Sequence, residues 1–233
     1  MRRENIIHLS TLFQYLRLKK GIFVHIEILP FRVVRVSDQD DLNKVAKLRY
    51  DAYARHLPQF AQTLASPEPA DYDDDNLVLL VVTKNTNTPL ATMRIHTNHK
   101  KSLPLEQATK LADSMSSSTL TEAVRFCVTA TPGLAGNLAR NVLFKAYFLA
   151  CIHYCTEWMV ICARSPLHRL YLKLLFNDIS PDGVSIALPY ADNIAHRVLA
   201  QQITQFEPLW YAAKHPLYNF IFRTHHPDIL IFG

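Results

Sequence analysis

The sequence predicts an α/β (α+β) protein in which a central mixed, twisted sheet carries helices on both faces. Three observations support this prediction. Apolar runs of strand length alternate along the chain with stretches of helical periodicity. Two neighbouring runs are joined by the short polar turn Asn85-Thr-Asn-Thr-Pro89, as in an antiparallel hairpin. Finally, 233 residues with 49% hydrophobic and 19% charged side chains suffice for the core of a globular protein.

The N-terminal residues are expected to form a helical arm. Between residues 5 and 20, apolar side chains recur at helical spacing and end in a basic cluster before Gly21. We therefore divide the chain into an arm, residues 1–30, and a main domain, residues 31–233. The sequence leaves open whether the arm caps the sheet, covers a ligand tunnel or touches a membrane surface.

The first half of the main domain is expected to alternate between strands and helices. A strand covers 31–36, and the acidic segment 37–41 opens a helix because negative charge suits a helix N-terminus. Prolines make 58–69 a loop. The uninterrupted apolar runs 77–83 and 90–96 are expected to be the buried strands of the hairpin.

The second half continues this alternation. The expected elements are, in chain order, a helix over 105–115, a strand over 122–129, a turn over 132–136, a helix over 138–154, a strand over 158–163, a helix over 166–176, a strand over 184–188, a helical region over 194–214 and a final strand over 217–222. Strands and helices in this order predict a mixed sheet.

Composition excludes several classes of function. No stretch approaches the roughly 20 apolar residues that a transmembrane helix needs, and charged residues interrupt the apolar runs of the first thirty positions. We therefore expect a cytoplasmic protein without a transmembrane segment. The four cysteines make no CxxC pair, and the 11 histidines lack metal-ligand spacing, so no metal site is expected.

The charge balance indicates an acidic partner. The net charge is +5, but the sequence contains neither a helix rich in Lys and Arg nor zinc-finger spacing. A small acidic protein is a better fit than a nucleic acid.

The segment from Val128 to Asn137 has the form of an anion site. A strand ends there in a turn containing Gly133 and Gly136, and a long helix begins near Asn137. Free amide groups at a helix N-terminus bind a phosphate or a phosphopantetheine. An ordinary turn before a helix explains the same residues equally well.

The segment 165–176 resembles the second signature helix of the GNAT acyl-CoA N-acyltransferase superfamily. Tyr171 and Phe176 match this signature, whereas Leu175 stands where glycine is usual. The resemblance implies a GNAT-like fold in which Tyr171 reprotonates the departing thiolate as a general acid. The alternative is a half-buried tyrosine on an apolar helix.

Five further segments occur in the order seen in FeeM-type N-acyl amino acid synthases, relatives of the LuxI-type acyl-homoserine-lactone synthases. They are 48–53, 71–76, 91–95, 103–106 and 122–128. The resemblance implies a charged cluster near the acceptor that consists of Arg49, Asp73, Arg94, Glu122 and Arg125. Asp73 is chosen over Asp71 and Asp74 from its distance to the following strand, and Phe126 and Val128 are also assigned to substrate binding.

Charges in apolar elements need partners of opposite sign, so these side chains are expected to meet. For Arg49 and Asp73, an equally simple role is to tie the first helix to the sheet. Glu122 is the candidate base, at a raised pKa, for the attacking ammonium. Strict alternation places Glu122 and Arg125 on opposite faces of their strand, so they share one site only if a bulge re-aims part of it.

Direct transfer requires a donor for the tetrahedral oxyanion, and the main-chain amide after Arg125 is the candidate. Alternatively, the thiol of Cys127 could carry the acyl group as a covalent intermediate. No His lies near Cys127 in sequence, so direct attack ranks first. Apolar side chains are candidates for an acyl tunnel, although such residues are more often plain core. They are Phe144, Tyr147, Phe148, Trp158, Met159 and Ile161.

The resemblance also implies a docking surface for acidic acyl carrier protein. Its basic residues lie near the second signature helix and are Arg164, Arg169 and Lys173. A solvated helix face explains the same charges. Arg94 or Arg125 is expected to hold the carboxylate of the acceptor by a bidentate contact.

The resemblance therefore implies an N-acyl amino acid synthase that moves a long-chain acyl group from acyl carrier protein to an amino acid, with tyrosine a fair guess. No permanently bound cofactor is expected, and the donor is carried on phosphopantetheine of the carrier protein or on CoA. A lactone synthase is the nearest alternative, but the segment 54–58 lacks the Gly-Trp that LuxI-type proteins carry there. An acetyl-CoA-dependent acetyltransferase and a non-catalytic acyl- or partner-binding GNAT-like module also stay open.

Overall fold

The computed structural model describes residues 25–129 and 134–232. The expected helix over residues 5–20 lies outside the described residues, as does Gly133.

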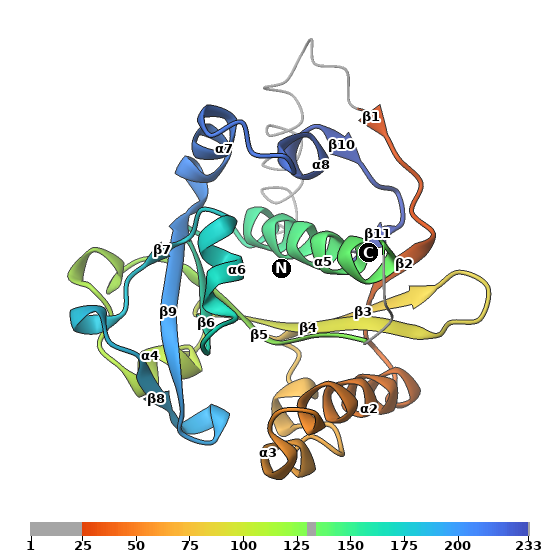
Figure 1. Cartoon of the computed structure of the whole chain (residues 1–233), viewed down its shortest axis with the longest axis horizontal. Coiled ribbons are helices and arrows are strands. Elements are labelled where there is room, and N and C mark those ends of the chain that lie inside the picture. Colours follow the sequence, from red (N-terminus) through yellow and green to blue (C-terminus); the bar gives the residue numbers. More distant parts are fainter. Residues whose placement is uncertain (1–24, 130–133, 233) are drawn as a thin grey trace, which may run out of the picture.

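A mixed sheet forms the centre of the described structure, with strand order β11-β2-β3-β4-β5-β6-β9-β7 (Figure 1). The strands are β2 Phe31–Arg35, β3 Leu77–Thr83, β4 Pro89–Thr97, β5 Leu120–Val128, β6 Trp158–Ala163, β7 Asn177–Asp178, β9 Ile194–Gln202 and β11 Ile229–Leu230. The pairs β11–β2 and β5–β6 are parallel, and the others are antiparallel. The short strand β8 (Ile186–Leu188) also pairs with β9, and β1 (His25–Ile26) pairs with β10 (Thr224–His225).

Helices cover both faces of this sheet, as predicted (Figure 1). The long helix α5 (Leu134–His153) lies on one face together with α6 (His168–Lys173), α7 (Ile203–Ala212) and α8 (Tyr218–Phe222). On the other face lie α2 (Gln39–Ala54) and α3 (Pro58–Gln62). The short helix α4 (Pro104–Ala108) leads towards β5.

The helix α2 begins where its acidic start predicts. The Oδ1 atom of Asp38 accepts a hydrogen bond of 2.8 Å from the amide of Asp41, which caps the helix. Val45 and Leu48 on its inner side pack against Val78 of β3. Burial of this apolar stripe fixes α2 against the sheet.

The predicted helical region 194–214 is wrong in its first half, because Ile194–Gln202 is the strand β9 beside β6. Val198 and Ala200 face one core cluster and Leu199 faces the other. A strand that is buried on both faces has a continuous apolar run, which does not distinguish it from a buried helix.

Three other predictions need correction. The expected strand 217–222 is the helix α8, in which the rings of Tyr218 and Phe222 contact each other one turn apart, with centroids 5.3 Å apart and planes inclined at 43°. The expected helix 105–115 ends at Ala108, and only a 3₁₀ turn over Asp113–Met115 follows. The expected loop 58–69 contains α3 and leads into a 3₁₀ turn over Pro69–Asp71.

Candidate active site

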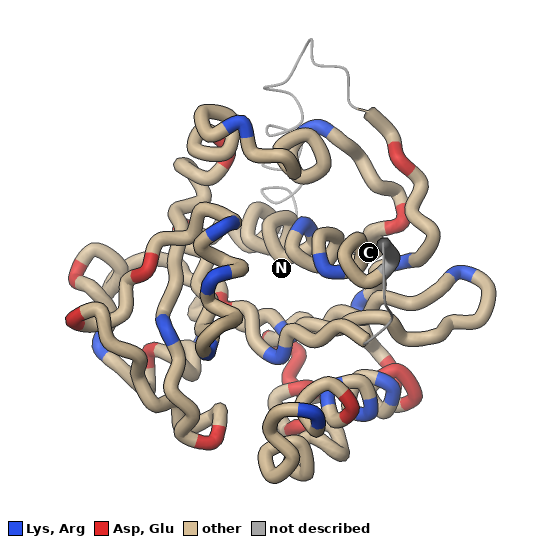
Figure 2. The backbone as a smooth tube through the Cα atoms, in the orientation of Figure 1, with Lys and Arg blue, Asp and Glu red and all other residues tan. Residues whose placement is uncertain are grey.

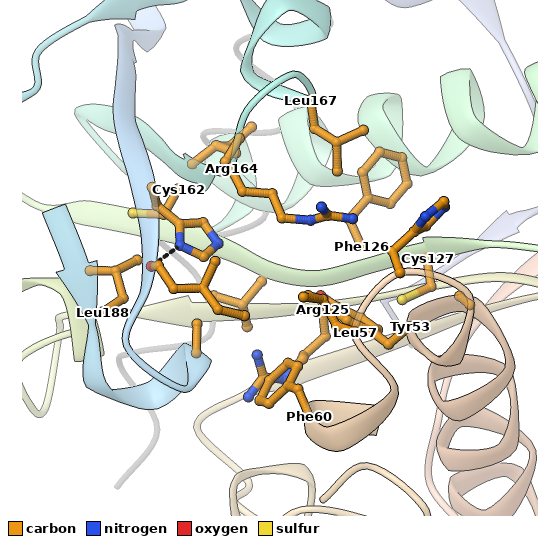
Figure 3. A pocket seen from close by; sticks show the side chains of 18 of the residues that line it. Tyr53, Leu57, Phe60, Arg125, Phe126, Cys127, Cys162, Arg164, Leu167 and Leu188 are labelled. Carbon is orange, nitrogen blue, oxygen red and sulfur yellow. Dashed lines mark hydrogen bonds between the residues drawn. The ribbon is translucent and has the colours of Figure 1, made fainter. Parts of the chain in front are cut away.

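The strands β5 and β6 part halfway along their length and leave a cavity. Their pairing runs from Leu120 opposite Trp158 to Ala123 opposite Ile161 and then stops, although β5 continues to Val128. A cavity of about 460 Å³ occupies this split (Figure 3). Its walls come from β5, β6, the end of α2, α3, Tyr171 of α6 and the segment 188–196.

A bulge in β5 places Glu122 and Arg125 on the same face of the sheet. Cys127 pairs with Thr92 and Val124 with Arg94, so Arg125 and Phe126 both lie opposite the single residue between them on β4. Arg125 takes a left-handed backbone conformation, with φ of 54°. Its side chain reaches the α2 side, whereas Phe126 packs into the core on the α5 side. The bulge on which a shared site for Glu122 and Arg125 was conditional is thus present.

Arginines from two elements, Arg49 of α2 and Arg94 of β4, meet at Asp71. Nη1 and Nη2 of Arg49 donate to its two oxygens at 2.7 and 2.9 Å, and Nη1 of Arg94 donates at 2.9 Å. All three side chains are buried. The choice of Asp73 was wrong, because Asp73 instead forms an ion pair with Lys101 near the surface. The 3₁₀ turn over Pro69–Asp71 carries Asp71 inwards.

Glu68 completes this cluster and was missed from the sequence. It accepts hydrogen bonds from Nε and Nη2 of Arg125 at 2.9 and 2.7 Å, and from Arg94 at 3.0 Å. Nη1 of Arg49 is 3.3 Å away. An acidic residue held between Pro67 and Pro69 was the available signal, since such a residue is fixed rather than freely solvated.

The arginines keep both carboxylates ionised. Burial alone would raise the pKa of Glu68 and of Asp71, but the hydrogen bonds and charges of the arginines outweigh it and lower both values. Three arginines against two carboxylates leave the cluster with one excess positive charge. The cluster joins α2, the segment that carries Glu68 and Asp71, and the strands β4 and β5 beside the cavity.

Glu122 lies behind the cavity rather than in its wall. Its carboxylate is fully buried and accepts a hydrogen bond of 2.6 Å from the hydroxyl of Tyr190, which does line the cavity. Among the described residues it forms no ion pair, so burial raises its pKa to about 7, against the smaller opposing effect of Tyr190. Tyr190 therefore connects this carboxyl group to the cavity.

Tyr171 reaches the cavity from the opposite side of the sheet. It lies close enough to Tyr53 and Cys127 to interact with them electrostatically, and all three line the cavity. Burial raises the pKa of the Tyr171 phenol, so it is protonated at neutral pH. Burial also raises the pKa of the Cys127 thiol to about 12, which makes this thiol a poor nucleophile.

The family model of the N-acyl amino acid synthase FeeM matches residues 44–184. This span is more than half of the chain and includes Arg49, Arg94, Glu122, Arg125 and Tyr171. The chain belongs to the FeeM family. No protein of curated function shows significant sequence similarity to it.

Solved structures show that this FeeM-family chain has a GNAT acyltransferase fold. FeeM from uncultured soil microbes is 14% identical, with a TM-score of 0.57 over 82% of this chain and 97% of that protein. BjaI, a CoA-dependent acyl-homoserine lactone synthase, is also 14% identical, with a TM-score of 0.55 over 84% and 93%. The acyl-homoserine lactone synthase LasI is 10% identical, with a TM-score of 0.54 over 74% and 89%.

The described cavities in this FeeM-family chain include two of the six residues predicted to line an acyl tunnel. Ile161 lines the larger cavity, and Phe144 lines a separate cavity of about 220 Å³ on the α5 side. Tyr147, Phe148 and Met159 are buried in the packed core, and neither they nor Trp158 line a described cavity. The other apolar walls of the larger cavity come from Leu57, Phe60, Val124, Val128, Leu167, Leu188 and Ile194.

The three basic residues expected at a docking surface lie in different places. Arg169 and Lys173 are exposed on α6, and Lys173 also lines the smaller cavity together with Arg140. Arg164 instead lines the larger cavity. Gly136 and Asn137 lie in the first turn of α5.

Two negative findings apply only to the described residues 25–129 and 134–232. Within them, no group of three or more His, Cys, Asp or Glu side chains gathers as metal ligands do. None of their helices combines the length and the apolarity needed to cross a bilayer.

Proposed function

We propose that this chain is an N-acyl amino acid synthase that transfers a long-chain fatty acyl group from acyl carrier protein to the amino group of an amino acid. The observation that carries the proposal is the cavity at the split between β5 and β6 in a chain of the FeeM family. A bulged strand, a protonated tyrosine and a buried carboxyl group converge on it. These are the groups that direct acyl transfer needs.

The reaction is a direct displacement. The amino nitrogen attacks the thioester carbonyl, and the carbon–sulfur bond breaks after a tetrahedral oxyanion has formed. The main-chain amide of Phe126, in the bulge of β5, is the proposed donor to this oxyanion, because residues of a bulge leave the regular ladder. Cys127 takes no covalent part, since its thiol stays protonated.

Glu122 is the proposed base, and it acts through Tyr190. The acceptor enters as an ammonium and must lose a proton before it attacks. Tyr190 lines the cavity, and its hydroxyl lies 2.6 Å from the carboxylate, so in this proposal it takes the proton from the amine as its own passes to Glu122. With a pKa of about 7, Glu122 is partly ionised at neutral pH.

Tyr171 is the proposed acid for the leaving group. Its raised pKa keeps the phenol protonated, and it enters the split from α6, on the face opposite the charged cluster. The thiolate of phosphopantetheine takes this proton as it leaves, and the second proton that the nitrogen loses as the amide forms returns to the Tyr171 phenolate. Donor and acceptor thus meet in the cavity from opposite faces of the sheet.

The α5 side of the molecule is the proposed docking side for the donor. Arg169 and Lys173 on α6 are exposed, and Figure 2 shows the basic positions of α5 and α6 on the same side of the sheet. Such a surface suits an acidic carrier protein. The first turn of α5, with Gly136 and Asn137, is the proposed end of the phosphopantetheine site.

Incubation of the purified protein with lauroyl-acyl carrier protein and a pool of amino acids, including tyrosine, tests the proposal. Mass spectrometry is expected to detect an N-lauroyl amino acid and a matching amount of free carrier-protein thiol. A parallel reaction with lauroyl-CoA compares the donors. Unchanged thioester in both reactions would refute the proposed activity, and a product formed only with S-adenosylmethionine would favour lactone synthesis.

A further inference from the structure

The two arginines expected to hold the acceptor carboxylate already have carboxylate partners. Arg94 donates from Nε to His96 at 2.9 Å and from Nη1 to Glu68 and Asp71. Arg125 donates from Nε and Nη2 to Glu68. A substrate carboxylate would have to compete with these buried ion pairs.

Arg164, at the end of β6, is an arginine of a different kind. It is half-buried, and Figure 3 shows its side chain extending into the cavity. Within the described part of the chain, its guanidinium group forms no hydrogen bond and no ion pair. The acidic side chains needed to neutralise it are also missing from the described wall of the cavity, whose charged residues are Arg55, Arg125 and Arg164.

A neutral histidine shares the cavity with Arg164. His196 lines the cavity and holds its Nδ1 atom 2.7 Å from the carbonyl of Ile194. Burial lowers the pKa of His196, the hydrogen bond to Ile194 opposes this, and the charges of Arg164 and Arg125 lower the pKa further. The imidazole is therefore neutral, and the cavity keeps an uncompensated guanidinium that suits an anionic ligand.

Another residue of the cavity wall leads to a carboxylate. Tyr190 lines the cavity and donates a hydrogen bond of 2.6 Å to the carboxylate of Glu122. A ligand with an ammonium for Tyr190 and a carboxylate for Arg164 matches these two groups. An α-amino acid is such a ligand.

We propose that Arg164 binds the α-carboxylate of the acceptor and thereby selects amino acids over simple amines. The inference rests on the proposed acyl transfer and names the residue that recognises the acceptor. The phosphate of the donor is the competing anion for Arg164. The acceptor is favoured because the cationic pair Arg140 and Lys173 already lines the separate cavity on the α5 side, where the donor is proposed to enter.

The test compares an amino acid with the amine that lacks its carboxylate, for example tyrosine and tyramine, in the wild type and in Arg164→Gln. The wild type is expected to prefer the amino acid in kcat/KM. The variant is expected to lose about 10- to 100-fold of this preference, the effect of a hydrogen bond to a charged group. Its rate with the amine and its KM for the acyl donor should stay unchanged.

Arg164→Lys serves as a second variant, because it keeps the charge but not the bidentate fork, and should recover part of the preference. The matched control is Arg35→Gln, which removes an exposed arginine at the end of β2. An unchanged preference in Arg164→Gln, or a raised KM for the donor instead, would overturn the inference. If no amine is acylated at all, the proposed function fails; calorimetric binding of the amino acid to wild type and Arg164→Gln then still decides the role of Arg164.

Discussion

The proposed chemistry depends, at the residue scale, on a carboxyl group that is buried next to a tyrosine rather than an arginine. Asp71 and Glu68 each contact more than one guanidinium group, and their pKa values are lowered. Glu122 lies on β5, opposite His96 of β4, and its pKa is raised to about 7. The same kind of side chain is thus fixed as an ion in one place and able to titrate near neutrality in the other.

Glu122→Gln is expected to remove the pH dependence of amide formation near neutrality. In the wild type, kcat/KM for the acceptor should rise as the pH passes through about 7, because only the ionised carboxylate accepts a proton. The variant should be slower by roughly 10²- to 10⁴-fold, without this rise. Initial rates between pH 5.5 and 8.5 measure both effects, and a variant that keeps the wild-type profile would exclude Glu122 as the base.

The same group is expected to reduce stability as the pH rises. The folded-state pKa of about 7 lies above the ordinary 4.5, so the native protein binds the proton more tightly than the unfolded chain does. This contribution to stability is present below pH 4.5 and is lost as the pH rises to about 7. Relative to Glu122→Gln, the wild-type free energy of unfolding should fall by on the order of 3 kcal/mol over that interval. Urea unfolding of both proteins at pH 4.5 and 7.5 measures this difference. The same change in unfolding free energy between the two pH values in wild type and Glu122→Gln would contradict the prediction.

Tyr171→Phe is expected to slow acyl transfer while leaving the fold intact. The ring keeps its contact with Phe176, whose centroid lies 6.2 Å away, and only the proton donor is lost. We expect kcat to fall by about 10-fold or more with little change in Tm. Single-turnover rates and thermal unfolding separate the two effects, and a normal rate in the variant would remove Tyr171 from the mechanism.

At the scale of elements, the buried cluster joins α2, the loop before β3 and the strands β4 and β5. Replacement of Asp71 by Asn should cost about 3–5 kcal/mol of unfolding free energy, because it leaves Arg49 and Arg94 buried with less compensation. Asp73→Asn is the matched control and should cost less than about 1 kcal/mol, since its ion pair is near the surface. Urea unfolding at pH 7 measures the difference, and equal losses would contradict the assignment of Asp71 to the cluster.

The sequence predicts those elements whose patterns have a single interpretation. The hairpin of β3 and β4, the helix α5 and the strand β6 follow from long apolar runs and clear turns. The strand β9 was mistaken for a helix because both of its faces are covered. Local pattern does not encode what a neighbouring element will cover.

The candidate site could be predicted only where its residues lie in regular elements. Arg49, Arg94 and Arg125 belong to a helix and two strands and were found from the ordered segments. Glu68 and Tyr190 lie in turns, where sequence distance says little about direction in space. Strict alternation places Arg125 on the face opposite Glu122, whereas the bulge in β5 brings both to the same face. The sequence around Arg125 contains no local signal for this bulge.

At the scale of the whole molecule, we propose that the split sheet separates acceptor recognition from acyl transfer. The match to the FeeM family covers residues 44–184, which contain the bulge, Glu122 and Tyr171. Tyr190 and His196, which line the proposed acceptor side, lie beyond that region. We therefore expect the choice of acceptor to depend on the segment 188–196 and Arg164, and the transfer chemistry on β5 and α6.

The most direct test of the central claim is a single-turnover reaction between a long-chain acyl-carrier-protein thioester and an amino acid, followed by mass spectrometry of the small molecules, the carrier protein and the enzyme. The account predicts that N-acyl amino acid and free carrier-protein thiol appear together in equal amounts, that no acyl group is found on the enzyme, and that Glu122→Gln slows both products alike. Thioester that stays intact, or that is only hydrolysed to fatty acid in the presence of the amino acid, would contradict it.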